Sequence, residues 1–181
     1  MQVDIIIAGF GGQGVLFAGQ LLAYAAMDNG YHVTWYPSYG PEMRGGTANC
    51  TVIIADEEIG APVVGSPQVL LAMNRPSLDK YESSVKPDGF LIINSSIIDR
   101  PVVRKDVHVI NVPANEIAEK IGDKRMTNMV MLGALLANLP LLSIETIVSE
   151  LRAHLPERHQ KLIPANIRAL TEGARFQLEP V

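Results

Sequence analysis

A glycine-rich turn near the start of the chain is the first candidate for chemistry. Gly9, Gly11 and Gly14 fit the pattern G-x-G-x-x-G, with Gly12 and Gln13 between them. The turn follows an apolar run and precedes a segment of helical period, which is the context that the pattern requires. Glycine lets a ligand approach the backbone closely, and the free N–H groups of a helix N-terminus attract negative charge. The turn therefore predicts a site for an anionic group or a partner subunit, unless the glycines serve only to pack strand against helix.

The same pattern could serve a dinucleotide, but a second part of such a site is missing. Dinucleotide-binding units carry an Asp or Glu about 20 residues further on, which binds the ribose hydroxyls. Here the second predicted strand runs into residues 35–39 (WYPSY), without an acid at its end and without an arginine for a 2′-phosphate. A Walker A loop is excluded because no Gly-Lys-Ser/Thr occurs. NAD binding therefore stays a weaker alternative.

A second cluster follows the second predicted strand. Ser38 and Tyr39 lead into Arg44, Gly45 and Gly46. Loops at the carboxyl ends of strands form the ligand crevice of an open α/β sheet, so we expect this loop beside the glycine turn. Arginine can donate two parallel hydrogen bonds to a phosphate or a carboxylate. The alternatives are an interface hot spot, because aromatic residues and arginine gather here, and an ordinary loop whose arginine pairs with a nearby acid.

The elements that must position these clusters follow from the apolar periodicity. A polar turn at residues 56–58 predicts a hairpin between strands 47–55 and 59–64, so the sheet is expected to be mixed. The whole pattern predicts one α/β domain over residues 1–181: a three-layer α/β/α fold with an open, mostly parallel sheet and a Rossmann-like first βαβ unit. The predicted strands are 3–8, 32–36, 47–55, 59–64, 69–73, 90–94 and 107–112, and the predicted helices are 15–27, one capped by Asn74, 114–121, 126–139, one capped by Ser143, and 164–176.

Composition narrows the classes of protein. Hydrophobic residues make up 48% and charged residues 19% of 181 residues, which predicts a folded core rather than a disordered chain. The net charge of −4 carries no basic stripe, so nucleic acid is not an expected partner. The longest apolar stretch, residues 130–144, is shorter than the roughly 20 residues of a membrane span. One cysteine and four scattered histidines predict no disulfide, no bound metal and a reducing, cytoplasmic location.

No arrangement of catalytic side chains can be assigned. Ser95 and Ser96 follow a predicted strand, but no histidine is placed by the sequence to activate a serine. Thr127 and Asn128 begin the apolar segment 126–139, which is typical of a helix cap. The residues alone therefore predict a shaped surface with a backbone cradle for negative charge, and no catalytic residue.

Three segments together resemble the gamma subunits of 2-oxoacid:ferredoxin oxidoreductases. They are residues 9–15 (GFGGQGV), 36–46 (YPSYGPEMRGG) and 128–134 (NMVMLGA). The similarity continues to the final predicted helix and so covers almost the whole chain. It marks the glycine turn, the cluster at residues 38–46 and Asn128 as candidate binding residues.

The resemblance implies a subunit of an enzyme that oxidatively decarboxylates 2-oxoglutarate or a related 2-oxoacid. Such an enzyme uses coenzyme A as co-substrate and yields acyl-CoA, carbon dioxide and reduced ferredoxin. In that family thiamine diphosphate and iron–sulfur clusters lie on other subunits, so no cofactor is implied on this chain. The implied partners are alpha, beta and ferredoxin-like subunits, with ferredoxin as acceptor and no membrane. A homodimer of the isolated chain, a free-standing NAD-dependent oxidoreductase and a pure interaction module stay open as alternatives.

Overall fold

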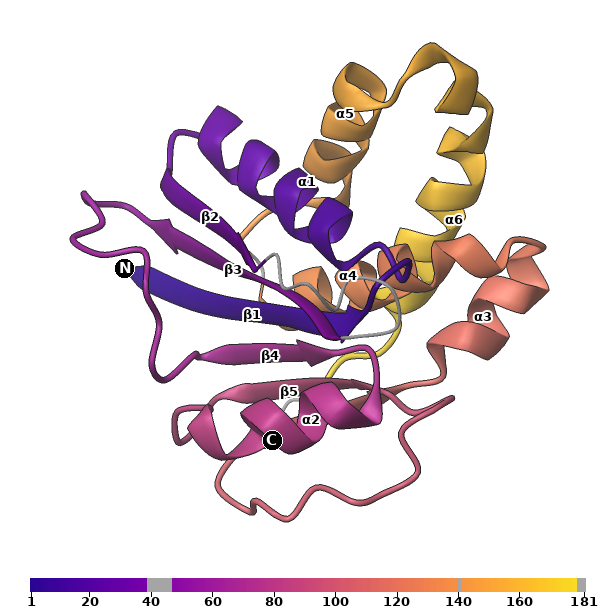
Figure 1. The fold of residues 1–181 in the computed structure, drawn as a ribbon. Coiled ribbons are helices and arrows are strands. Elements are labelled where there is room, and N and C mark those ends of the chain that lie inside the picture. Colours follow the sequence, from indigo (N-terminus) through magenta and orange to yellow (C-terminus); the bar gives the residue numbers. More distant parts are fainter. Residues whose placement is uncertain (39–46, 140, 179–181) are drawn as a thin grey trace.

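A mixed sheet forms the centre of the molecule (Figure 1). The computed structural model describes residues 1–38, 47–139 and 141–178. Within these ranges the sheet has six strands in the order β2-β3-β1-β4-β5-β6. The strands are β1 (Gln2–Phe10), β2 (His32–Ser38), β3 (Thr47–Ala55), β4 (Val69–Ala72), β5 (Phe90–Asn94) and β6 (His108–Val112).

Six α-helices and three 3₁₀ turns of the described residues surround this sheet. The helices are α1 (Val15–Asp28), α2 (Arg75–Tyr81), α3 (Ala114–Ile121), α4 (Thr127–Asn138), α5 (Ile144–His154) and α6 (Ile163–Gly173), and the 3₁₀ turns are η1 (Glu82–Ser84), η2 (Lys124–Met126) and η3 (Glu157–Leu162). In the described ranges no helix combines the length and the apolar character that crossing a membrane requires.

Helix ends follow the local signals in the sequence. Asn74 Oδ1 accepts a hydrogen bond from the Ser77 backbone N–H at 2.9 Å and caps α2. Ser143 Oγ accepts from the Thr146 N–H at 3.1 Å and caps α5. Gly122, with φ +97°, ends α3 in the left-handed region. Each cap was predicted from the sequence, because capping depends on neighbours a few residues away.

The position of β3 corrects one sequence-based prediction. The strand pairs antiparallel with both β1 and β2 and so lies between them. The predicted partner at residues 59–64 is not a strand, so the hairpin prediction was wrong. Pro62 removes a backbone donor from that segment, and an apolar run does not reveal which strand it pairs with. The sheet is nevertheless mixed, as the sequence predicted.

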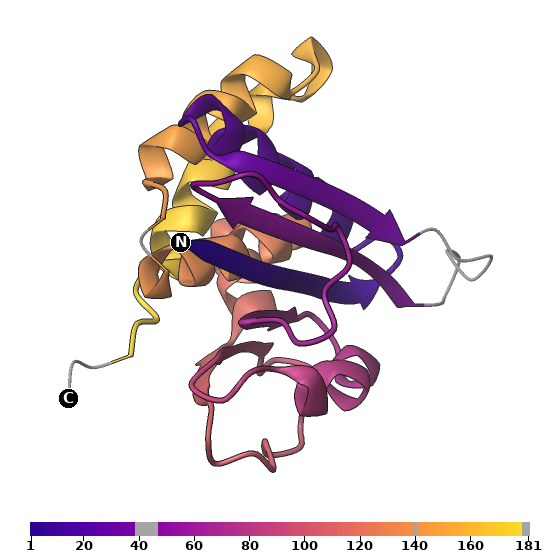
Figure 2. The same cartoon turned by 90° about the vertical axis from the view of Figure 1, so that its left-hand side faces the viewer.

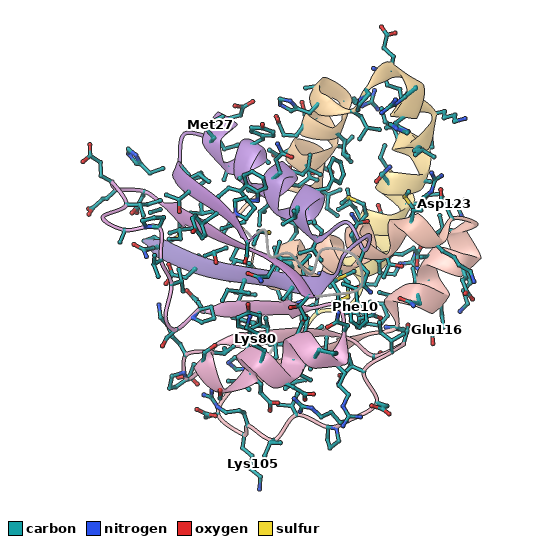
Figure 3. The ribbon with its side chains drawn as sticks, in the orientation of Figure 1. Phe10, Met27, Lys80, Lys105, Glu116 and Asp123 are labelled. Carbon is teal, nitrogen blue, oxygen red and sulfur yellow. The ribbon has the colours of Figure 1, made fainter. Side chains whose placement is uncertain are left out.

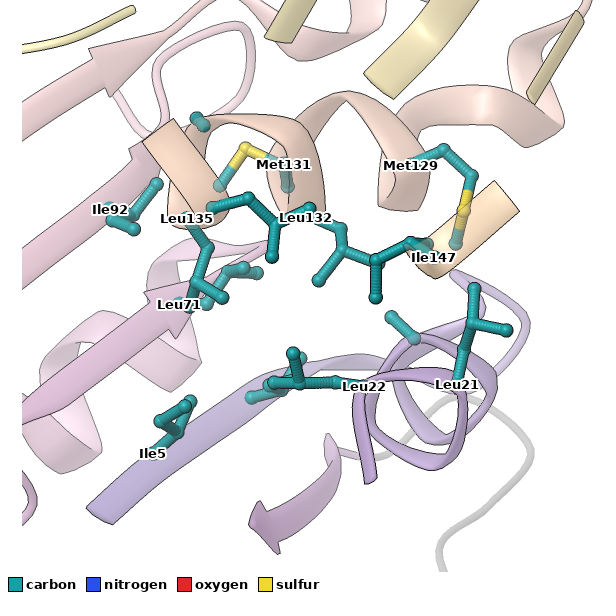
Figure 4. Packing of buried hydrophobic residues seen from close by; sticks show 14 of the residues in the cluster. Ile5, Leu21, Leu22, Leu71, Ile92, Met129, Met131, Leu132, Leu135 and Ile147 are labelled. Carbon is teal, nitrogen blue, oxygen red and sulfur yellow. The ribbon is translucent and has the colours of Figure 1, made fainter. Parts of the chain in front are cut away.

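The two faces of the sheet are covered unequally. The large core lies between one face and α1, α3, α4, α5 and α6, while the smaller core holds Leu78 of α2 against the other face (Figures 1 and 2). Because both faces are covered at the centre, Ile5, Ile6 and Ile7 of β1 are all buried. Figure 4 shows side chains of α4, among them Leu132 and Leu135, in this larger core.

Helices α4 and α6 pack backbone to backbone through a pair of glycines. A Cβ placed on Gly133 would overlap the carbonyl oxygen of Leu170, and a Cβ on Gly173 would overlap that of Val130. The two contacts are reciprocal: each helix offers a glycine to a carbonyl of the other. This close approach explains why α4, apolar on nearly every side, is a buried helix, with Gly133 inside the segment 128–134.

Replacing either glycine with alanine should therefore destabilise the fold. For Gly133→Ala or Gly173→Ala we expect a loss of about 3 kcal/mol, or a melting temperature lower by roughly 6–12 °C, because the helices must separate. Thermal unfolding followed by circular dichroism measures this. Gly60→Ala is the matched control, since a Cβ there meets nothing within 4 Å. Equal stability of all three variants would show that the helices do not approach so closely.

A buried carboxyl joins α5 to the end of α1. Glu150 is 5% exposed, and its Oε2 lies 3.1 Å from Nε2 of His154, whose ring stacks on Tyr24 of α1. Burial, and then the nearby carboxylate of Asp28, raise the pKa of Glu150 above its ordinary value, although His154 acts in the opposite direction. A carboxyl group whose pKa is raised in the folded state binds its proton more tightly there, so stability falls as pH rises through that pKa.

Glu150→Gln should consequently stabilise the protein at neutral pH. We expect a melting temperature higher by a few degrees at about pH 7.5, with the difference shrinking toward about pH 4, where Glu150 itself is protonated. Thermal unfolding over this pH range tests the sign, with the exposed Glu57→Gln as control. A less stable Glu150→Gln variant at neutral pH would mean that the attraction of His154 outweighs burial.

Candidate functional site

The glycine turn joins the carboxyl end of β1 to the start of α1. Gly12 and Gly14 have φ of +92° and +72°, a region that favours glycine. Gly14 is the N-cap residue of α1, so no side chain caps the helix, and its first turn holds no acidic residue. The N–H groups and the positive end of the helix dipole are therefore left to another acceptor.

Gln13 holds the turn in this shape. Its Oε1 accepts a hydrogen bond from the Phe10 N–H at 2.6 Å, and its Nε2 donates to the Met73 carbonyl, at the end of β4, at 3.5 Å. Gly9 is required beneath it, because a Cβ there would lie 2.6 Å from Gln13 Oε1 and 2.7 Å from Met73 Cβ. Gly9 thus allows tight packing, which was the alternative interpretation of the glycines, and Gln13 braces the turn.

Asn128 braces the turn from the opposite side. The side chain is 6% exposed; its Nδ2 donates to the Gly14 carbonyl at 3.2 Å, and its Oδ1 accepts from the Met129 N–H at 2.9 Å. Asn128 therefore ties the start of α4 to the start of α1. The side chain positions the turn, and it does not line the cavity described next.

A cavity of about 260 Å³ opens beside the turn. It is lined by Gly12, Gln13, Asn115, Lys124, Arg125 and Thr127. Asn115 lies in the first turn of α3, and the two cations belong to η2, which follows α3 in the chain. Figure 3 shows Phe10, at the end of β1, in the same part of the molecule as Glu116 and Asp123 of these segments.

Both cations of the cavity have acidic neighbours. Arg125 donates to both carboxylate oxygens of Asp123, with Nη2 to Oδ2 at 2.7 Å, and this hydrogen bonding lowers the pKa of Asp123. Lys124 Nζ lies 3.0 Å from Glu119 Oε1. Neither carboxylate lines the cavity. The charges are therefore balanced nearby, while the lining itself is rich in hydrogen-bond donors.

A second cavity of about 300 Å³ shares Arg125 with the first. Its walls are mostly apolar and come from the start of α1, from η2 and from η3. Phe17, which is 36% exposed, belongs to this wall. The edge around the glycine turn thus combines a polar hollow with an apolar one.

The structure places the predicted site residues in three different situations. Gly11, Gly12, Gln13 and Gly14 form the turn, and Gly12 and Gln13 reach the cavity. Ser38 is exposed at the end of β2, opposite Asn49 of β3. Four further predicted residues lie outside the described residues: Tyr39, Arg44, Gly45 and Gly46.

Asn115, Lys124 and Arg125 were missed in the sequence. Asn115 is the third residue after β6. Its place at the carboxyl edge of the sheet could therefore have identified it as a candidate site residue. Lys124 and Arg125 follow Gly122 on a short 3₁₀ turn, and no sequence motif marked them as binding residues. Their approach to the glycine turn depends on how α3 packs against α4.

The place of β3 bears on the NAD alternative. In the Rossmann strand order, the second strand of the first unit lies directly beside the first, and its end supplies the ribose contact. Here β3 lies between β1 and β2, with Thr47 opposite Phe10 at the carboxyl end of β1. The neighbouring strand end is therefore occupied by β3, which disfavours a dinucleotide lying across it.

The one thiol is unsuited to ligation or catalysis. Cys50 is fully buried in β3, and burial raises its pKa to about 12 although Trp35 acts in the opposite direction. A protonated thiol is neither a good nucleophile nor a metal ligand. Over the described ranges, no three His, Cys, Asp or Glu side chains gather where they could hold a metal ion.

Comparison with known proteins gives consistent matches over nearly the whole chain. Residues 4–176 match the model of the pyruvate ferredoxin/flavodoxin oxidoreductase family. The ketoisovalerate oxidoreductase subunit VorA of Methanothermobacter thermautotrophicus is 41% identical over 181 residues, but this chain spans only 37% of its length. The 2-oxoglutarate synthase subunit KorC of Methanothermobacter marburgensis is 36% identical, over 99% of this chain and 98% of that protein.

A solved structure shares the fold. The keto/oxoacid ferredoxin oxidoreductase gamma subunit from Geobacter sulfurreducens superposes with a TM-score of 0.83 at 28% identity, covering 97% of this chain and 96% of that one. The mixed α/β architecture is therefore the architecture of this gamma subunit.

Two alanine variants of the turn should separate backbone strain from the contact with Asn128. Both glycines have positive φ, but a Cβ on Gly12 meets nothing within 4 Å, whereas one on Gly14 would collide with the Asn128 amide. We expect Gly12→Ala to cost about 1 kcal/mol, and Gly14→Ala about 2 kcal/mol more, in the free energy of unfolding. Denaturant titration measures both.

The double variant Gly14→Ala/Asn128→Ala supplies the control. Removing the amide relieves the collision, so its destabilisation should be smaller than the sum of the two single variants. Strict additivity would show that Asn128 does not press against the turn.

Proposed function

Because this chain belongs to the pyruvate ferredoxin/flavodoxin oxidoreductase family, we propose that it supplies the gamma-type unit of a 2-oxoacid:ferredoxin oxidoreductase. The observation that carries the proposal is the end-to-end match with a 2-oxoglutarate synthase subunit, over 99% of this chain and 98% of the relative. The 2-oxoacid would be 2-oxoglutarate or a related one, and residues 1–181 would act as one unit in the cytoplasm.

The proposed complex oxidatively decarboxylates its substrate. The bond between the keto carbon and the carboxylate breaks and carbon dioxide leaves. The keto carbon bonds to the sulfur of coenzyme A, the thiol proton is released, and the electron pair passes to oxidised ferredoxin. Thiamine diphosphate and iron–sulfur clusters would supply this chemistry from alpha, beta and ferredoxin-like subunits. The buried thiol of Cys50 does not fit a cysteine-ligated cluster, so no step is assigned to this chain.

This chain's own contribution is proposed to be the edge around the glycine turn. The uncapped start of α1, together with Lys124 and Arg125 in the adjoining cavity, suits the phosphate groups of coenzyme A. Phosphate oxygens accept hydrogen bonds from backbone N–H groups and from guanidinium more strongly than neutral acceptors do. The anion proposed for the turn would thus be a phosphate of the co-substrate.

The same edge has the composition of a subunit contact. Phe10, Phe17 and Tyr36 are 39%, 36% and 58% exposed, and they lie at the carboxyl ends of β1 and β2 and at the start of α1. Large aromatic side chains are costly to leave in water and are enriched at interface cores. We therefore place the thiamine-binding core of the complex against this edge.

Arg125→Ala in the assembled complex tests the role of the cavity. We expect the KM for coenzyme A to rise at least tenfold with little change in kcat, since a charge-assisted hydrogen bond is worth about 1.5–3 kcal/mol. Steady-state kinetics of the purified complex measures this. Lys105→Ala is the control, because this exposed lysine lies far from Phe10 and Asp123 (Figure 3). Unchanged coenzyme A kinetics, with intact assembly, would remove the cavity from the proposal.

Co-purification tests the subunit role independently of coenzyme A. The chain expressed at native level in its host should be recovered together with a thiamine-binding subunit. The purified material should reduce ferredoxin when a 2-oxoacid and coenzyme A are supplied. Recovery of the chain free of any such subunit would contradict the proposed function as a whole.

A further inference from the structure

Two asparagines lie behind the cavity beside the glycine turn. Asn94 is the last residue of β5 and is completely buried. Its Nδ2 donates to the Met73 carbonyl at 3.4 Å and to Asn115 Oδ1 at 3.0 Å. Asn115 lies half-buried in the first turn of α3, and it is the residue of this pair that reaches the cavity.

These contacts fix the orientation of both amide groups. A backbone carbonyl can only accept, so the Asn94 nitrogen must face Met73. The same nitrogen then has its second hydrogen for Asn115, and this requires Asn115 to turn its oxygen toward Asn94. The backbone of Asn115 is held as well: its N–H donates to Ser96 Oγ at 3.0 Å, and Ser96 Oγ donates to Glu116 Oε2 at 2.8 Å.

Gln13 is oriented by the same rule on the other wall. Its oxygen is occupied by the Phe10 N–H at 2.6 Å. Both amide side chains that line the cavity therefore have their oxygens engaged in a hydrogen bond with another group of the protein. The cations of Lys124 and Arg125 can only donate, which leaves the Thr127 hydroxyl, whose proton goes to the Lys124 carbonyl at 2.9 Å, as a side-chain acceptor in the lining.

We infer that Asn94 is a positioning residue that makes the cavity selective for ligands with acceptor atoms, by forcing Asn115 to present its NH₂ group. The inference rests on the proposed function, in which a phosphate binds beside the turn. It deepens that function by assigning the selectivity for the ligand to Asn94, a residue too deeply buried for a ligand to touch. An amide that was free to rotate could accept as readily as donate. With Asn94 in place, a phosphate or carboxylate oxygen finds an NH₂ donor at Asn115, whereas an ammonium or amide N–H finds no acceptor at this side chain.

This arrangement leaves one polar atom of Asn94 without a hydrogen bond. Its Oδ1 is buried and has no hydrogen-bond partner among the described residues. An unpaired buried acceptor destabilises the folded state, so a leucine would suit this position better if stability alone mattered. The orphaned oxygen is explained when the amide nitrogen serves the neighbouring site.

Titration of the full chain with pyrophosphate tests the inference directly. Pyrophosphate is a suitable ligand because its surface consists of oxygen atoms that accept hydrogen bonds. The NMR chemical shifts of the Gly12 and Gln13 backbone amides report its binding at the turn. Asn115→Asp keeps an oxygen for Asn94 but places a second, negative oxygen where the NH₂ group was. We expect it to weaken binding at least tenfold, whereas Asn111→Asp, an equal charge change on an exposed residue of β6, should change it less than twofold.

A double-variant cycle separates positioning from general support of the fold. Asn94→Leu and Asn115→Leu should each weaken pyrophosphate binding about three- to tenfold, and Asn94→Leu should add nothing once Asn115 is leucine, because Asn94 acts through it. Melting temperatures of all variants show whether the fold is intact. Effects that multiply would mean that Asn94 supports the turn by another route and would overturn the inference.

The outcomes also distinguish this inference from the function on which it rests. If the wild-type chain binds pyrophosphate and Asn115→Asp binds it equally well, the inference is wrong while the phosphate site survives. If millimolar pyrophosphate leaves the turn amides unmoved in the wild-type chain, both the phosphate site and the inference fail. The subunit role would then rest on co-purification alone.

Discussion

The hydrogen bonds that hold the glycine turn are the constraint on which the rest of the site depends. Gln13 joins the turn to β1 and β4, and Asn128 joins it to α4. In each of these side chains both the amide oxygen and the amide nitrogen form a hydrogen bond within the protein, so the turn is fixed from two sides. A helix N-terminus held in this way keeps its N–H groups pointed at one place without closing them off by a cap.

The packing of α4 in the core supports the hydrogen bond between Asn128 and the turn. Helix α4 carries Asn128 to the turn, and the glycine contacts at Gly133 and Gly173 hold the same helix close against α6. The residues of the glycine turn and of α4 therefore divide by physical role. Gly9, Gln13 and Gly133 serve packing and bracing, and the exposed backbone of Gly12 is the part that a ligand or a partner can reach.

The described side chains at this edge suit the binding of an anionic ligand or of a partner surface. Donors gather on one cavity, apolar and aromatic side chains surround it, and the one thiol is buried inside the sheet. This is what a unit needs if it presents a surface and a phosphate cradle to an enzyme whose redox centres lie elsewhere. The buried Asn94 and the half-buried Asn115 extend the same logic, because together they set which hydrogen-bonding group the cavity presents.

The sequence by itself determined the features that depend on near neighbours. The helix caps at Asn74, Ser143 and Gly122, the buried β1 strand and the glycine turn all follow from residues within one or two turns of each other. Tertiary structure alone decided where β3 pairs, because an apolar strand can add to either side of a sheet. It also decided that Asn115, Lys124 and Arg125 meet the glycine turn across more than a hundred residues of sequence. Local patterns record a residue's own turn or strand, whereas the approach of distant segments is set by how their apolar faces pack.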